Sequence, residues 1–186
     1  WTGIPLARLP RVVLPGQPIG QVCALAAEET GLLPGIPLLA GATDGTAAQI
    51  ASGAAYPGDW NSTLGTTLVF KGISRELRLD PLGRVYFHRH PEGWWMPGGA
   101  SNTGTDWIGR DHPGADLGEL GRQAGQCIPT RLLRYPLLKQ GERFPFIHPQ
   151  ASGFLLGEPA SVAELYAAGL EGLALVERLA YDTLQS

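Results

Sequence analysis

The chain has 186 residues, 44% of them hydrophobic and 17% charged, so it is long enough for one domain with a core or for parts of two domains. Its formal net charge of −3, with only two lysines among fourteen basic residues, argues against binding nucleic acid through a basic face. No apolar stretch is long enough to span a bilayer, so no membrane partner is expected.

The first 56 residues alternate between loops rich in proline and glycine and short regular elements. Gly31 is placed to end a helix in the left-handed conformation. The apolar run before Gly41 is typical of a buried strand in a parallel sheet, and small residues after Asp44 indicate a helix closed by Gly53. We therefore expect a strand at 12–14, a helix at 22–30, a strand at 36–40 and a helix at 46–52.

The expected secondary structure changes after Tyr56-Pro-Gly58, where short strands begin to predominate. The pattern predicts two strands within 61–73 around a turn at 64–67, further strands at 85–88 and 94–96, and helices near Trp107 and at 117–126. A final helix opens with Ser161 and Glu164, which form an S-x-x-E capping box. Its apolar residues recur every three or four positions as far as Ala180, so we expect this helix to cover a sheet.

Strands and helices in this order predict an α/β fold with a mixed sheet flanked by helices. We expect a domain boundary near residue 56, where the expected secondary structure changes. Cys23 and Cys127 lie far apart, and so few cysteines fit the reduced thiols of a cytoplasmic protein.

Asp44 follows the strand expected at 36–40 and precedes a helix. In open α/β sheets the carboxyl ends of the strands line the ligand crevice, and a carboxylate there can accept a proton from a substrate hydroxyl. Gly41 and Gly45 would let the substrate approach. The alternative is that Asp44 is the N-cap of the helix, a position that favours aspartate.

Two glycine-rich segments are candidates for a phosphate or nucleotide site. Gly65, Thr66 and Thr67 form a turn that offers small backbone and hydroxyl donors, although a plain hairpin turn explains them too. The segment 98–104, with Gly99 and Thr103, follows a strand and precedes a helix, where free amides can bind anions. Close packing of that helix against the sheet is the alternative.

Other polar residues are given no catalytic role. His88 and His90 face the same side of a strand, but no third metal ligand is evident near them, so ordinary hydrogen-bonded histidines are expected. Gly141-Glu142-Arg143 is interpreted as an ion-paired turn.

The motifs resemble, in order, those of the FGGY carbohydrate kinases. Ile36-Pro-Leu-Leu-Ala-Gly-Ala-Thr-Asp-Gly45 resembles the strand and aspartate that close the family's first lobe, and Asn61-Ser-Thr-Leu-Gly-Thr-Thr67 resembles its second phosphate motif. Gly98-Gly-Ala-Ser101 is similar to the next nucleotide-side segment, Gly141-Glu-Arg-Phe-Pro145 to the G-E-R-x-P region, and Ala168-Gly-Leu-Glu-Gly172 to the A-x-x-E-G helix. The resemblance runs over nearly the whole chain, and residues 43–45 and 98–104 look most like the ribulokinase and xylulokinase-like branch.

The resemblance implies two lobes of the ribonuclease-H-like, actin-type ATPase fold, only partly present in this chain. Residues 1–56 would be the C-terminal segment of the first, sugar-binding lobe, and residues 57–186 the N-terminal part of the second, nucleotide-binding lobe. The family's amino-terminal phosphate hairpin and its late adenosine segment have no counterpart here, so we expect the 186 residues alone to have no kinase activity.

The implied reaction is phosphorylation of a sugar hydroxyl by ATP with Mg²⁺, most simply on a ketopentose such as D-ribulose or D-xylulose. Asp44 would be the general base and would bind the sugar with Thr43, while Gly65, Thr66, Thr67, Gly99 and Thr103 would bind ATP. No residue is expected to bind the metal directly, although Asp44 could reach it through water. Partners would be the sugar or polyol and ATP, with a homodimer left open. The alternatives are a non-catalytic sugar- or nucleotide-binding member of the actin-like superfamily and a purely structural module.

Overall fold

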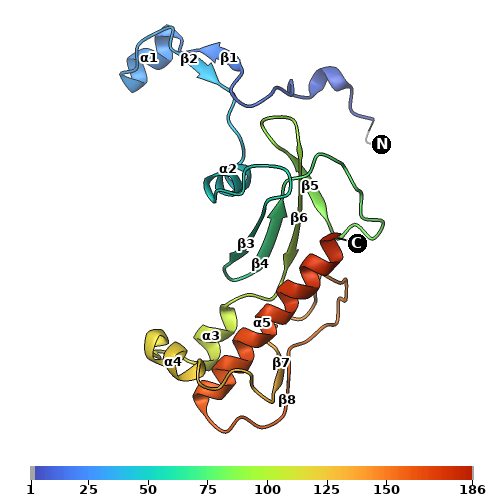
Figure 1. Cartoon of the computed structure of the whole chain (residues 1–186). Helices are drawn as coiled ribbons and strands as arrows, with labels where there is room; N and C mark the ends of the chain where they lie inside the picture. Colours follow the sequence, from blue (N-terminus) through green and yellow to red (C-terminus); the bar gives the residue numbers. More distant parts are fainter. Residues whose placement is uncertain (1–2, 186) are drawn as a thin grey trace.

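A computed structural model describes residues 3–185 and contains five α-helices and eight strands within them (Figure 1). After a 3₁₀ turn, the elements of the first part are β1, α1, β2 and α2 at Pro18–Gln21, Ala24–Thr30, Pro37–Leu39 and Asp44–Ala51. The central strands β3, β4, β5 and β6 span Trp60–Leu64, Leu68–Gly72, Tyr86–Arg89 and Trp95–Ser101. The last part contains α3, α4, β7, β8 and α5 at Asp106–Asp111, Leu117–Ala124, Leu133–Tyr135, Phe154–Leu156 and Val162–Gln185.

Strands β1 and β2 and helix α1 form a small unit that projects away from the central sheet, whereas α2 lies beside the sheet (Figure 1). Gly31 ends α1 with φ 73°, as expected. The buried parallel strand predicted at 36–40 is wrong, because β2 pairs antiparallel with β1 and is exposed along its length. The strand predicted at 12–14 is also wrong: Val12 is 96% exposed, and it is Pro18–Gln21 that finds a pairing partner.

The central sheet has the order β3-β4-β6-β5, and every strand pairing among residues 3–185 is antiparallel. The α/β class expected for the chain and the strands expected after residue 60 are confirmed. Helix α5 crosses one face of the sheet (Figure 1). There Phe70 packs with Phe144, Val176 and Ala180, so the apolar stripe of the final helix does cover a sheet.

A second core forms where α3 and α4 meet the first half of α5. Trp107 is fully buried at its centre, packed with Leu120 and Tyr166. Gly169 makes this packing feasible, because a Cβ there would lie 2.3 Å from the Trp107 ring. The two cores together join α3, α4 and α5 to the central sheet.

The start of α5 follows the predicted capping box with one difference. The Ser161 hydroxyl accepts a hydrogen bond from the Glu164 amide at 3.1 Å, as expected. The Glu164 carboxylate accepts from the amide of Ala160 at 2.6 Å, one residue earlier than the predicted pattern. No helix within residues 3–185 has the length and apolar character to cross a membrane, and the two cysteines are unbonded.

Candidate functional site

The glycine–threonine turn at 65–67 lies at the tip of the hairpin formed by β3 and β4. The Gly65 amide donates to the Thr67 carbonyl at 3.0 Å, which closes the turn tightly. Within residues 3–185, no group accepts a hydrogen bond from the amides or hydroxyls of Thr66 and Thr67. The turn therefore presents free donors to solvent, which is the chemistry that a phosphate group requires.

A neighbouring loop, residues 102–105, holds the 65–67 turn from behind. The Thr103 carbonyl accepts from the Leu68 amide at 2.9 Å, and both the amide and the hydroxyl of Thr105 donate to the Gly65 carbonyl, at 2.8 and 2.9 Å. A Cβ at Gly104 would lie 2.2 Å from the Thr66 carbonyl oxygen, so only glycine permits this approach. The structure thus brings together the two glycine-rich segments that the sequence singled out.

Gly99 and Thr103 lie behind this surface, and their role in binding ATP stays a prediction. Thr103 is fully buried, and its hydroxyl donates to Glu142 at 3.1 Å. Gly99 faces the Phe144 ring, which would lie 2.7 Å from an added Cβ. The expected helix start differs as well, since 98–101 belong to β6 and α3 begins only at Asp106.

Glu142 anchors the 102–105 loop and was missed as a functional residue. Its side chain is 3% exposed and accepts five hydrogen bonds. The donors are the hydroxyls of Ser101 at 2.8 Å, Thr103 at 3.1 Å and Tyr135 at 2.7 Å, and the amides of Asn102 at 2.7 Å and Arg143 at 3.0 Å. The predicted ion-paired turn is therefore wrong, because this carboxylate is satisfied by neutral donors. Its only signal in the sequence was the resemblance of residues 141–145 to a family motif.

Asp44 is the first residue of α2, but it is not the cap. The Thr43 hydroxyl caps the helix by accepting from the Thr46 amide, so the alternative role for Asp44 is excluded. The Asp44 carboxylate is exposed and accepts from the amide of Gly45 at 2.7 Å. Its second oxygen has no protein partner within residues 3–185 and is free for a ligand. Four residues, 40–43, separate it from β2, so it does not follow a strand directly.

Lys71 lies under the first turn of α2 and was not anticipated. It is 7% exposed, and its Nζ donates to the Gly45 carbonyl at 3.1 Å and lies 3.4 Å from Nδ1 of His88. Burial lowers the pKa of Lys71, which the charge of Asp44 partly opposes. Burial and then the Lys71 charge lower the pKa of His88. His90 packs instead on the Trp94 ring, and residues 3–185 contain no cluster of metal ligands.

The structure does not bring Asp44 to the 65–67 turn. Lys71, which contacts the first turn of α2, pairs with Asn61 toward the open end of the β3–β4 hairpin, whereas Leu64 and Leu68 flank the turn at the other end. Figure 1 shows α2 beside that open end. No hydrogen bond within residues 3–185 joins Asp44 to Thr66.

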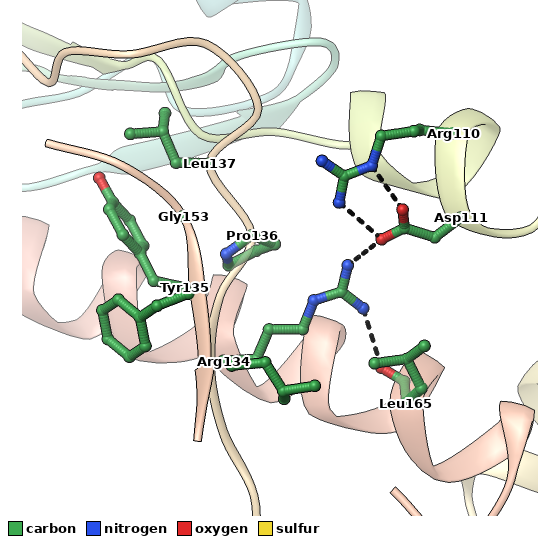
Figure 2. A pocket seen from close by; sticks show the side chains of 10 residues that line it. Arg110, Asp111, Arg134, Tyr135, Pro136, Leu137, Gly153 and Leu165 are labelled. Carbon is green, nitrogen blue, oxygen red and sulfur yellow. Dashed lines mark hydrogen bonds and ion pairs between the residues drawn. The ribbon is translucent and has the colours of Figure 1, made fainter. Parts of the chain in front are cut away.

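A separate pocket of about 430 Å³ lies between α3, α5 and the β7–β8 hairpin (Figure 2). Asp111 pairs there with Arg110 and Arg134, and the Arg134 guanidinium also donates to the Leu165 carbonyl at 3.0 Å and lies over the Trp107 ring. Hydrogen bonding from Arg110, and then Arg134, lowers the pKa of Asp111. Because the Asp111 carboxylate is paired with both guanidinium groups, and Arg134 also bonds to α5, we interpret the cluster as one that stabilises the packing of α3 on α5.

The described residues could bind Mg²⁺ only weakly, through water and with the help of substrate phosphates. It binds proteins through one or two carboxylates and otherwise through waters and substrate phosphates. Asp44, exposed and with a free oxygen, fits such a contact through water.

The fold is that of the actin-type ATPases, as found in FGGY carbohydrate kinases. Xylulose kinase from Rhodospirillum rubrum superimposes with a TM-score of 0.83 at 29% identity, over 98% of this chain and 38% of that chain. Xylulose kinase from Brucella ovis gives a TM-score of 0.86 at 26% identity, over 99% of this chain and 39% of that chain. Gluconokinase from Bacillus licheniformis is 27% identical, over 77% of this chain and 31% of the relative.

No family model matches the chain. The expected resemblance to FGGY carbohydrate kinases is nevertheless confirmed by these solved structures. The chain spans less than two fifths of the length of each of these relatives.

Proposed function

We propose that this chain is part of a kinase that transfers the γ-phosphoryl group of ATP to a hydroxyl group of a sugar. The observation that carries the proposal is its fold, shared along nearly its whole length with xylulose kinases at TM-scores of 0.83 and 0.86. The unpaired donors of Thr66, which is exposed, and of Thr67, which is half-buried, support it, because phosphoryl transfer depends on positioning and charge stabilisation more than on covalent chemistry.

In this proposal residues 1–56 belong to a sugar-binding lobe and residues 57–186 to a nucleotide-binding lobe. Asp44 accepts the proton of the attacking hydroxyl, and Thr43 lies beside the sugar. Gly65, Thr66 and Thr67 hold the β- and γ-phosphates, while Gly99 and Thr103 shape the nucleotide side from behind. Mg²⁺, bound with ATP, neutralises phosphate charge.

Asp44 and the 65–67 turn lie toward opposite ends of the β3–β4 hairpin, which leaves a space between them for the sugar and the phosphates of ATP, and we expect the lobes to close over this space. Closure of this kind also excludes water, which otherwise competes with the sugar as acceptor. The remainder of a chain of the relatives' length would supply the surfaces that close.

The proposed acceptor is a ketopentose, D-ribulose or D-xylulose. Two of the similar solved structures are xylulose kinases, and the curated relative is a gluconokinase. Gluconate is therefore the competing acceptor to test.

The test is sugar-dependent ADP release by the protein at the length of its relatives. Mg-ATP is supplied with ribulose, xylulose, ribitol, glycerol or gluconate, and Asp44→Asn is the matched variant. We expect turnover with one acceptor and a fall in kcat of ~10²–10⁴-fold in the variant with ATP affinity retained, because general-base help is of that size. Near-full turnover of the variant would remove Asp44 from the base role.

A non-catalytic binding protein is the second candidate, favoured by the separation of Asp44 from the 65–67 turn. Such a protein binds ATP or a polyol without bringing them together. Calorimetric binding of ATP with no ADP release for any acceptor would support it over the kinase.

A further inference from the structure

Lys71 is buried, which is unusual for a lysine. It projects from β4 on the face of the sheet opposite Phe70, which packs under α5. Burying an ammonium costs free energy unless it is hydrogen bonded. Its Nζ donates to the Gly45 carbonyl at 3.1 Å, in the first turn of α2 and one residue after Asp44.

Gly45 is matched to this lysine. A Cβ at position 45 would lie 3.1 Å from the Lys71 Nζ, closer than ordinary van der Waals contact. The backbone of Gly45 is not in the left-handed region, so its lack of a side chain is explained by room for the ammonium group. In the segment Thr43-Asp44-Gly45, the threonine caps α2, the aspartate presents a carboxylate, and the glycine leaves room for the Lys71 ammonium group.

We propose that Lys71 is a positioning residue for Asp44, linking the two proposed lobes through the start of α2. This inference rests on the proposed function for its catalytic consequence. The contact crosses the proposed boundary near residue 56, so it fixes the first turn of α2 on the sheet that carries the 65–67 turn. The charge of Asp44 in turn favours the ammonium form of Lys71.

The charged and titratable groups around Lys71 come from two elements. Asp44 faces it from α2, and its charge favours the ammonium form. His88 faces it from β5, and Tyr86 lies on the same face of that strand, with its ring against Gly98, the partner of Lys71 on β6. Neither His88 nor Tyr86 supplies negative charge at neutral pH, so Asp44 is the carboxylate that acts on Lys71.

The first test needs no kinase activity. In protein labelled with ¹³C-lysine, the ε-methylene signal of Lys71 is the one that disappears in Lys71→Arg. We expect Lys71 to titrate below the ordinary lysine range and to titrate lower still in Asp44→Asn, where the favourable charge is removed. An unchanged Lys71 titration in that variant would show that Asp44 does not act on Lys71 and would overturn the proposal. Asp44 is exposed, so it can be changed without disturbing a core.

The second test measures turnover at the length of the relatives. Lys71→Met should lower kcat at least tenfold and change KM for ATP less than twofold, whereas Lys71→Arg should recover part of kcat by restoring a charged donor. Lys139→Met, at an exposed lysine, is the control and should leave turnover unchanged. Equal losses in the Met and Arg variants, or a loss confined to KM, would overturn the positioning role.

The two proposals fail in different ways. Wild-type protein without sugar-dependent ADP release would overturn the kinase but leave the lysine titration as it stands. Turnover in the wild type with normal kcat in Lys71→Met would overturn the role of Lys71 alone.

Discussion

Gly104 lies directly against the backbone of Thr66: an added Cβ would stand 2.2 Å from the Thr66 carbonyl oxygen and 2.3 Å from its carbonyl carbon. Because the opposing atoms belong to backbone, they cannot turn aside as a side chain could. The shape of the 65–67 turn is therefore set from a segment almost forty residues further along the chain.

Gly104→Ala should displace the turn and destabilise the protein by about 1–3 kcal/mol, the usual range for overpacking. Urea denaturation measures this, and calorimetry with ATP should show weaker binding. Gly109→Ala is the control, since its Cβ meets nothing within 4 Å in α3 and alanine is the better helix former. Equal stability of the two variants would contradict the close approach.

Glu142 should tolerate an amide better than an apolar side chain. In Glu142→Gln the amide NH₂ can face the hydroxyls of Ser101, Thr103 and Tyr135, which can turn to accept, so we expect a loss of about 1 kcal/mol. Glu142→Leu removes the acceptor of five donors, of which the hydroxyls of Ser101 and Thr103 are fully buried, and should cost about 3 kcal/mol or more. Chemical denaturation distinguishes the two, and similar losses would show that the hydrogen bonds matter less than the volume.

Gly169→Ala should disrupt the core around Trp107. The added Cβ would lie 2.3 Å from a ring that is fully buried and covered by the Arg134 guanidinium, so the ring has no room to move. We expect a loss of about 1–3 kcal/mol in the free energy of unfolding. Gly121→Ala in α4, where a Cβ meets nothing within 4 Å, should not destabilise.

His112 should make stability fall as the pH is lowered. It is 6% exposed between the rings of Trp107 and Tyr166, and neither ring nitrogen has a partner in the described structure. Burial lowers the pKa of His112, an effect opposed by Asp111 and reinforced by Arg134. The unfolded chain therefore binds the proton at higher pH than the folded chain does, and stability is lost as pH falls through the ordinary histidine range.

Thermal unfolding between pH 5 and pH 8 measures this dependence. His88, whose pKa is also lowered, contributes with the same sign. The variant His112→Phe should flatten the profile but not abolish it. A profile as steep in His112→Phe as in the wild type would assign the effect to other groups.

The hairpin and the final helix were predictable because their signals are local. The apolar run Leu68-Val-Phe70 after Gly65-Thr66-Thr67 indicates a strand that follows a turn, and a three- and four-residue spacing specifies the buried stripe of α5. The strand at Pro37–Leu39 was placed correctly, but its partner and its burial were not. An apolar run has the same appearance whether its faces are covered or open.

The sequence by itself determined the helices, the strands of the central sheet, the glycine–threonine turn and the resemblance to FGGY carbohydrate kinases, but not β1, β7 or β8. Only the tertiary structure decided that Glu142 holds the 102–105 loop and that Lys71 reaches Gly45. The reason is physical. Turns, caps and periodic faces depend on neighbours within a few residues, whereas the partners of Glu142 and Lys71 lie up to 41 and 26 residues away and are chosen by packing.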